Sequence, residues 1–155
     1  MENMILRDAV AADAPAISAL ILELAPLMTV DGKGEGAAGF LLSLAPAAIA
    51  AYIAAPNYRY QLGFLDGALA GVVAVRDGRH VFHLFVARAL HGRGLARRLW
   101  AAARTAAGDA DGYTVNSSCY ALPMYEHFGF VASGPRVEKD GIAFVPMRLA
   151  ALAGR

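Results

Sequence analysis

Two Asp-Gly pairs in the middle of the chain do most to restrict its fold. They occupy residues 66–67 and 77–78, and both lie between short apolar segments within residues 58–86. Asp-Gly favours the tight turns that join antiparallel strands, because these residues tolerate positive φ. The pattern therefore predicts three consecutive hairpin-type strands, and it argues against a purely parallel sheet.

A helix follows the third of these strands and leads to another strand. In residues 94–107, Leu95, Leu99, Ala102 and Ala106 recur at helical spacing, so this face is expected to pack on the sheet. A short strand is predicted at 113–116. A strand, a helix and a strand in this order favour one right-handed parallel crossover, and hence a mixed α/β (α+β) domain.

The remaining segments complete a single domain over residues 1–155. A first strand is predicted at 4–10, followed by a helix with Asp13 as its N-cap and Pro15 in its first turn. One broken or two short helices are expected within 40–56. The chain then ends with a short helix at 122–128 and strands at 130–138 and 142–150. The predicted order is β-α-α-β-β-β-α-β-α-β-β, with about seven strands in a mixed sheet.

Charge and composition exclude several classes of function. The formal net charge is only +1, so neither nucleic acid nor an anionic membrane is expected as a general partner. Residues 37–56 carry no charge, but Pro46 and many alanines disfavour a membrane span. The start, "MENMILRD", lacks a basic region followed by an apolar run, so no signal peptide is expected, and the single cysteine, Cys119, is typical of a reducing cytosol. We therefore expect a cytoplasmic protein.

The turn before the 94–107 helix is rich in glycine and arginine. Gly92 and Gly94 remove side chains that would keep an anion from the amides at the helix start. Arg93, Arg97 and Arg104 lie on one side of the helix. The turn is too short for a dinucleotide fingerprint, and no Lys-Ser or Lys-Thr follows for a nucleoside-triphosphate loop. The residues alone leave two interpretations open, an anion site or an ordinary strand-to-helix turn.

A resemblance to a known family favours the anion site. The segment "HLFVARALHGRGLARRLW" followed by "TVNSSCYALPMYEHFGF" resembles the acetyl-coenzyme-A-dependent N-acetyltransferases of the GNAT superfamily. The family's loop pattern is Gln or Arg, two residues, Gly, one residue, then Gly or Ala, and here it occupies residues 91–96 with His91 in the first position. Asn116, Tyr125 and Gly129-Phe130 match the family's second conserved region. The resemblance covers the whole chain in element order and residues 81–130 most specifically.

The resemblance implies a GNAT fold, with a central parallel pair of strands splayed at the cofactor site, and acetyl-CoA as co-substrate. The amides from Gly92 to Ala96 would hold the pyrophosphate, and the pantetheine arm would pair with the backbone at Phe85 and Val86. His91 departs from the pattern, which puts in doubt any help from that side chain. The cofactor-binding residues expected on this basis are Leu84, Phe85, Val86, His91, Gly92, Arg93, Gly94, Leu95, Ala96, Arg97, Asn116 and Tyr125.

The same resemblance suggests roles in acetyl transfer. The amide near Val86 would contact the thioester oxygen, Tyr125 would act as general acid, and Asn116 would contact the pantetheine or order a water. The alternatives are a packed aromatic for Tyr125 and a strand-terminating residue for Asn116. His80 and His83 are candidate general bases, although strand histidines are more often structural, and Glu23 is a weaker candidate.

Other chemistry is less favoured by the residues. His83 is expected to share a strand face with Val81 and Phe85 and to point away from His80, so no metal site is expected. Cys119 has no histidine beside it in the motif, which disfavours a covalent acyl intermediate.

The predicted function is therefore transfer of acetyl from acetyl-CoA to a primary amine by direct attack, with a small-molecule acceptor favoured over a peptide. A non-catalytic acyl-CoA-binding module and another kind of nucleotide-binding domain are the rivals. The acceptor pocket is expected from the first two helices, residues 29–39 and the hairpin at 139–141. A homodimer through residues 37–56 or the final hairpin is possible by association with the family.

Overall fold

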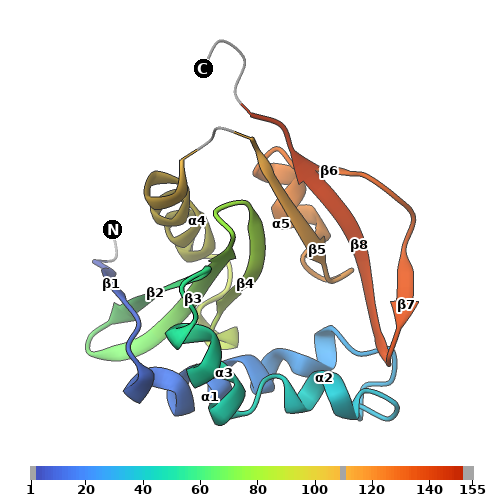
Figure 1. Cartoon of the computed structure of the whole chain (residues 1–155), viewed down its shortest axis with the longest axis horizontal. Helices are drawn as coiled ribbons and strands as arrows, with labels where there is room; N and C mark the ends of the chain where they lie inside the picture. The colour runs from blue at the N-terminus through green and yellow to red at the C-terminus, as the bar shows by residue number, and fades with distance from the viewer. Residues whose placement is uncertain (1–2, 109–110, 152–155) are drawn as a thin grey trace.

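The computed structural model describes residues 3–108 and 111–151, and within these the chain forms one mixed sheet with helices on both faces (Figure 1). The strand order is β1-β2-β3-β4-β5-β8-β6, and β7 pairs with β8 as the eighth described strand. Their bounds are β1 Ile5–Asp8, β2 Tyr58–Leu65, β3 Ala68–Arg76, β4 His80–Val86, β5 Tyr113–Ser117, β6 Val131–Ala132, β7 Val137–Lys139 and β8 Ile142–Leu149. The predicted mixed α/β class is confirmed.

The two Asp-Gly turns join β2, β3 and β4 into an antiparallel meander, as predicted. Asp66 and Gly67 adopt φ of 50° and 80°, and Asp77 and Gly78 adopt 55° and 69°. These left-handed conformations match the right-handed twist of the strands that they connect. The turns therefore fix the first half of the sheet.

The central strands β4 and β5 are parallel and separate almost at once. In the described chain they pair at His80 with Thr114 and at Val81 with Val115 and then diverge (Figure 1). The partner strands differ, since β4 pairs with β3 on its other side whereas β5 pairs with β8. The splayed parallel pair implied by the resemblance is present.

A β-bulge in β4 lies at the point of divergence. Val75 of β3 pairs with Val81, but Ala74 pairs with His83, so Phe82 is an extra residue in β4. A bulge bends its strand and increases the local twist. It also corrects a prediction: Val81 packs in one core cluster while His83 and Phe85 lie on the other face, because strict alternation fails across the extra residue.

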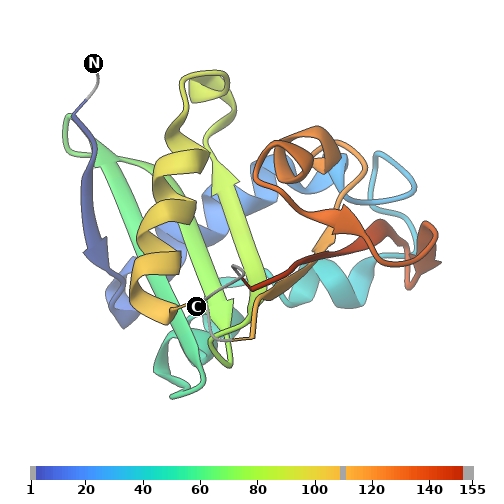
Figure 2. The same cartoon turned by 90° about the horizontal axis from the view of Figure 1, so that it is seen from above.

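Helices lie on both faces of the sheet, with α4 on one face of the β1–β4 half, α1 on the opposite face, and α5 beside the β5–β8 half (Figure 2). Their bounds are α1 Ala14–Leu24, α2 Ala38–Leu42, α3 Pro46–Ala54, α4 Leu95–Ala107 and α5 Leu122–His127. One core cluster lies under α4 and α5, and the other lies under α1 and α3. The buried Ser18 hydroxyl of α1 donates to the Leu44 carbonyl at 2.6 Å, which ties α1 to the segment between the two short helices. In the described chain, we find no helix long and apolar enough to span a bilayer.

The buried face of α4 differs from the predicted one. Leu95 and Leu99 are buried as expected, but Trp100 and Ala103 complete the face in place of Ala102 and Ala106. The indole of Trp100 packs edge-on against Tyr113, with ring centroids 4.8 Å apart. Because burial of this large side chain is favourable, the face of α4 that contains Trp100 packs on the sheet. The spacing of the smaller apolar residues did not indicate this face.

Two smaller predictions are also corrected. The strand predicted at 130–138 is divided into β6 and β7, because a bend at Gly134-Pro135 interrupts it and proline has no amide to donate. Asp13 precedes α1 but does not cap it. Its carboxylate instead accepts from the Val10 amide and forms a bidentate pair with Arg7, which lowers its pKa.

Gly71 allows close packing of β3 between β4 and α4. A methyl group on Gly71 would lie 2.7 Å from a Leu99 methyl and 2.8 Å from the Phe85 carbonyl oxygen. We expect Gly71→Ala to lower the free energy of unfolding by about 2 kcal/mol, because overpacking displaces backbone as well as side chains. Urea unfolding measures this change. The matched control is Gly39→Ala in α2, where nothing lies within 4 Å. It should be neutral or stabilising, and equal losses in the two variants would contradict the packing explanation.

Candidate active site

The glycine turn after β4 adopts a conformation that glycine favours. Gly92 and Gly94 have φ of 83° and 78°, and Gly94 is the N-cap of α4. A Cβ at either position would meet nothing within 4 Å, so the backbone conformation, not crowding within the chain, explains both residues. Beyond Gly94 the first amides of α4 have no carbonyl partner within the helix, and they form a partly positive site.

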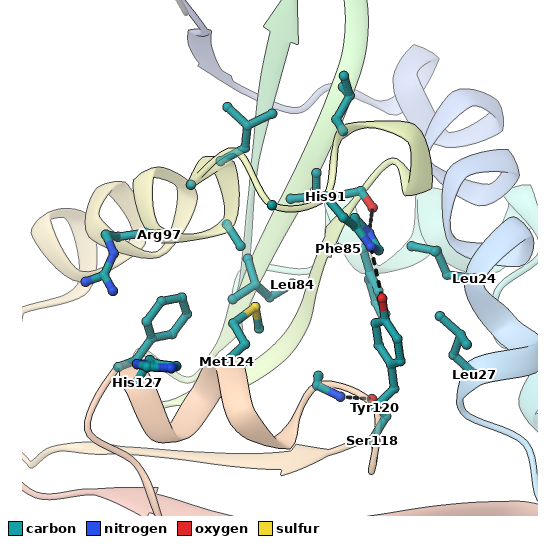
Figure 3. A pocket seen from close by; sticks show the side chains of 18 of the residues that line it. Leu24, Leu27, Leu84, Phe85, His91, Arg97, Ser118, Tyr120, Met124 and His127 are labelled. Carbon is teal, nitrogen blue, oxygen red and sulfur yellow. Dashed lines mark hydrogen bonds between the residues drawn. The ribbon is translucent and has the colours of Figure 1, made fainter. Parts of the chain in front are cut away.

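A cavity of about 560 Å³ extends from this turn into the gap between β4 and β5 (Figure 3). It brings together most of the predicted cofactor residues: Leu84, Phe85, Val86, His91, Gly92, Gly94, Leu95, Ala96 and Arg97. Arg93, Asn116 and Tyr125 do not line it. The opposite wall comes from α1, the turn after it, and the β5–α5 region, and these residues were not predicted: Leu24, Leu27, Met28, Leu90, Ser118, Tyr120, Ala121, Met124, His127 and Phe128.

The predicted group of arginines is divided by the fold. Arg97 lines the cavity, and its guanidinium lies 5.5 Å from the centre of the Phe128 ring. Arg104 instead lies 5.7 Å from the ring centres of both Trp100 and Tyr113, so the predicted stacking on Trp100 involves Arg104. Of these two side chains, only Arg97 is placed to act on a ligand in the cavity.

His91 is bound to the end of β4 and to the loop before α5. Its Nε2 lies 2.7 Å from the Val86 carbonyl oxygen, and its Nδ1 lies 3.3 Å from the Tyr120 hydroxyl. A carbonyl oxygen only accepts, so Nε2 carries a proton and, in the neutral ring, Nδ1 accepts from Tyr120. Figure 3 shows the two side chains directed toward one another. The imidazole therefore connects the two walls of the cavity.

A second cavity of about 340 Å³ adjoins the first. The two share Met28, Leu84, Phe85 and Ser118, and the second one is also lined by the predicted chemical residues His80, His83, Asn116 and Tyr125. Residues within 40–52, in the second predicted helical segment, also contribute to its wall, and so do residues 142–144 at the start of β8, which were not predicted. The first helix and the hairpin at 139–141 do not line it. Residues 29–39 do not line it. They pack on the β7–β8 turn, where the Val30 amide donates to the Gly141 carbonyl at 2.9 Å.

Tyr125 lies at the end of α5 and is almost completely buried. Its ring packs edge-on against Phe130 and Phe128, with centroids 5.4 and 6.2 Å away. Burial raises the pKa of the Tyr125 phenol because the charged phenolate is poorly solvated there. The hydroxyl is therefore protonated at neutral pH. Tyr125 is therefore a packed aromatic residue, and it also lines the second cavity.

The two candidate bases differ in their surroundings. His83 is buried, stacks on Phe82 at 4.2 Å and has Nδ1 3.0 Å from the Tyr60 hydroxyl, and burial lowers its pKa to about 3. His80 is partly exposed, and its Nδ1 lies 2.8 Å from the Thr114 hydroxyl. Burial, with a further effect from Arg76, lowers the pKa of His80. Both rings are neutral at pH 7.

Glu23, the weaker candidate, lines neither cavity. Within the described residues, no three histidine, cysteine or acidic side chains gather where they could hold a metal ion. Cys119 is exposed in the β5–α5 loop and lines neither cavity. Tyr60, the partner of His83, was missed by the sequence analysis because a hairpin tyrosine at this position carries no motif.

Comparison with known proteins agrees with this geometry. The profile of the Acetyltransferase (GNAT) domain family matches residues 28–151. A comparison with curated protein sequences finds no significant match. The fold is similar to that of a GCN5-related N-acetyltransferase from Rhodopseudomonas palustris, with a TM-score of 0.79, 23% identity and 97% of each chain covered.

Two further solved structures are similar over nearly the whole chain. One is the PaiA N-acetyltransferase from Thermoplasma acidophilum in complex with coenzyme A, with a TM-score of 0.69, 12% identity, and 96% of this chain and 99% of that chain covered. The other is an acyl-CoA N-acyltransferase from Pseudomonas aeruginosa, with a TM-score of 0.66, 15% identity, and 96% and 100% covered. At such low identity these likenesses show the fold.

The fold and the paired cavities are those of an acyltransferase. The family match covers most of the chain, and the protein belongs to the GNAT acetyltransferase domain family. The resemblance found in the sequence is thereby confirmed, and so is the predicted enzyme class, an acetyl-CoA-dependent acyltransferase.

The buried His83 should make stability depend on pH. Its pKa is about 3 in the folded chain, whereas an unfolded histidine titrates near 6.5. Protonation therefore favours the unfolded chain. The contribution of neutral His83 is complete above about pH 6.5 and is lost as pH falls toward 3, by up to about 1.4 kcal/mol per pH unit. Urea unfolding between pH 7 and pH 4 should show this slope.

His83→Asn should be less stable at pH 7 and should lose stability less steeply on acidification. His127→Gln, which changes an exposed histidine, is the control and should keep the slope of the unmodified protein. Parallel curves for His83→Asn and the unmodified protein would contradict burial of a neutral imidazole.

Proposed function

We propose that the protein moves an acetyl group from acetyl-CoA to the primary amine of a small molecule by direct attack. The observation that carries this proposal is the meeting of two cavities at Leu84, Phe85 and Ser118. The larger one ends at a helix N-terminus, which favours a phosphate group, and the smaller one contains the candidate acid and bases. A thioester at the shared wall would be open to an amine from the second cavity.

Backbone amides at the start of α4 and Arg97 would hold the pyrophosphate. The pantetheine would lie beside β4, beyond its short pairing with β5. Ala87 donates its amide to Ala70 of β3, so by strand alternation the backbone groups of Val86 and Leu84 face the gap and those of Phe85 face β3. The Val86 carbonyl already accepts from His91. We therefore assign the Val86 amide to the thioester oxygen. The coenzyme A bound by the Thermoplasma relative supports this use of the larger cavity.

In the proposed reaction, the amine nitrogen attacks the thioester carbon, the carbon–sulfur bond breaks, and the thiolate leaves. Tyr125, the proposed general acid, donates a hydrogen bond to the departing sulfur, and its proton passes to the thiolate as the proton lost by the amine replaces it. Its raised pKa keeps the phenol protonated before the reaction. Asn116, on the same cavity, would orient a water or the cofactor amide.

The amine must lose a proton during the attack. His80 is the more accessible of the two histidines, because it is partly exposed, and when its Nδ1 donates to Thr114 its Nε2 is the basic nitrogen. It pairs with Arg76, away from the junction of the two cavities, so it would take the proton through water. His83 is the weaker base, since its pKa is about 3. A base is dispensable if the amine is already neutral when bound.

The size of the second cavity supports a small-molecule acceptor over a protein. About 340 Å³ matches a compact ligand, at the low end of typical small-molecule pockets. The exposed thiol of Cys119 is consistent with a reducing cytoplasmic location, which we propose on that ground. The homodimer through residues 37–56 stays a prediction.

Acetyl-CoA should stabilise the protein against heat, whereas ATP and NAD should not. A ligand that binds only the folded state stabilises it by RT ln(1 + L/Kd), where L is the ligand concentration, so the melting temperature rises with the logarithm of that concentration. A thermal-shift series with the three ligands at matched millimolar concentrations measures the difference. A shift with ATP or NAD but none with acetyl-CoA would favour a different nucleotide-binding domain.

Tyr125→Phe should lower kcat for acetyl transfer by about a hundredfold at neutral pH, the usual scale for removal of a general acid. Coenzyme release across an amine panel gives kcat, and calorimetry should give an unchanged Kd for acetyl-CoA. The control is Tyr58→Phe, since Tyr58 is partly buried and lines neither of the two cavities. Acetyl-CoA binding without turnover of any amine by the unmodified protein would favour a non-catalytic binding module instead.

A further inference from the structure

The second cavity has an unusual composition for a site that receives an amine. Among the described residues its wall contains no aspartate or glutamate. Its apolar surface is largely aromatic, with rings from α2, α3, β4, α5 and β8: Phe40, Tyr52, Phe82, Phe85, Tyr125 and Phe144. A wall without carboxylates offers no counter-charge to an ammonium group, so polycationic amines are poor ligands for it.

Two of these aromatic rings pack against one another, and one of them also stacks on His83. Tyr52 of α3 meets Phe82 of β4 edge-on, with centroids 4.9 Å apart, and Phe82 stacks on His83 at 4.2 Å. The bulge places Phe82 here as an additional residue of β4. Such a rigid aromatic wall favours a flat, apolar ligand over a flexible aliphatic one.

Arg76 contributes the one permanent charge among the described lining residues. It lies at the end of β3, opposite His80 in the strand pairing. Its Nε is 3.6 Å from the Asp77 carboxylate, and both side chains are exposed enough that this pair contributes little. Asp77 itself does not line the cavity. A ligand carboxylate can therefore pair with the guanidinium from inside.

Arg76 and the proposed reaction centre lie at opposite ends of the cavity. His80, opposite Arg76, and Phe85, on the wall shared with the larger cavity, are five residues apart on β4. Because Phe82 is an extra residue in the bulge, the same span on β3 runs over four residues, from Arg76 to Val72, which is about 13 Å of strand. The long arginine side chain covers part of that distance. A ligand that reaches both ends is elongated and carries its amine and its anion far apart.

We propose that the acceptor is an elongated arylalkyl amine that carries a carboxylate at the end opposite its amine, with Arg76 as the specificity-determining residue. This inference rests on the proposed function. The aromatic side chains bind the ring, Arg76 binds the carboxylate, and the amine lies at the junction of the two cavities.

The same surroundings prepare the amine for attack. An apolar wall without carboxylates disfavours the ammonium form and lowers the pKa of the bound amine. The neutral amine is the nucleophile. The lack of carboxylates in the wall thus explains both the discrimination against cationic ligands and the activation of the acceptor amine. Because the bound amine is already neutral, the weakly basic His80 and His83 are sufficient to take up its proton during the attack.

A matched set of acceptors tests the proposal with the full-length protein. Phenethylamines with a para-carboxylate, a para-carboxamide or a para-trimethylammonium group have the same ring and amine but differ in charge. We expect kcat/KM to fall in that order, by about tenfold at each step, in a coenzyme-release assay with saturating acetyl-CoA. Aliphatic polyamines should be the poorest acceptors. Highest activity with the trimethylammonium compound would overturn the proposal.

Variants at Arg76 separate its charge from the shape of the cavity. Arg76→Met should abolish the preference of carboxylate over carboxamide, mainly through KM, and Arg76→Glu should favour the trimethylammonium compound. Arg79→Met is the control, because Arg79 is exposed in the same turn and does not line the cavity. Thermal melting checks that each variant is folded. An unchanged order of acceptors in Arg76→Met would refute the assigned role.

Failure of the proposed function looks different in these experiments. Absence of acetyl-CoA binding would overturn both the proposed function and this inference. Binding of acetyl-CoA with acetylation only of amines outside the phenethylamine set would retain the transferase and overturn the acceptor class. Acetylation of all three compounds at equal rates would likewise retain the transferase and remove the role of Arg76.

Discussion

The structure depends on the point at which β4 stops pairing with β5. After two paired residues the strands separate, and the exposed backbone of β4 faces a gap instead of a neighbour. Unpaired amides and carbonyls inside a protein must find other partners. Here the Val86 carbonyl is satisfied by His91, and the adjacent amides border a cavity of about 560 Å³. A fold that leaves backbone groups available between two half-sheets is suited to bind an amide-containing chain such as pantetheine.

The bulge at Phe82 contributes to the separation and to the chemistry on both sides of it. One extra residue places Val81 in the core under α4 and His83 among the aromatic side chains of the other face. The pair Tyr60–His83 is thereby buried beside the second cavity instead of under α4. The same irregularity in β4 thus shapes the wall of the proposed acceptor pocket and fixes a neutral imidazole within it.

Local signals made much of this predictable from the sequence. The Asp-Gly turns specify hairpins through residues that accept positive φ, and Gly92 and Gly94 mark the turn before α4 for the same reason. These turns helped to predict the order of the strands and helices.

The features that could not be predicted from the sequence depend on packing between segments that are distant along the chain. The buried face of α4 includes Trp100, which packs on Tyr113. The strand predicted at 130–138 is interrupted at Gly134-Pro135, although its apolar pattern is continuous.

The site residues divide in the same way. Motif positions at the larger cavity were predictable because the family pattern fixes their spacing, but Tyr120, Arg76 and the aromatic wall belong to no motif. His91 is the clearest case. A histidine where the family has glutamine or arginine gave no indication of its partners, yet in the fold it connects Val86 to Tyr120. A side chain that donates to the end of β4 fixes the backbone whose neighbouring amide we assign to the thioester. His91 therefore acts on the site through the main chain, by holding the end of β4 against the loop that carries Tyr120.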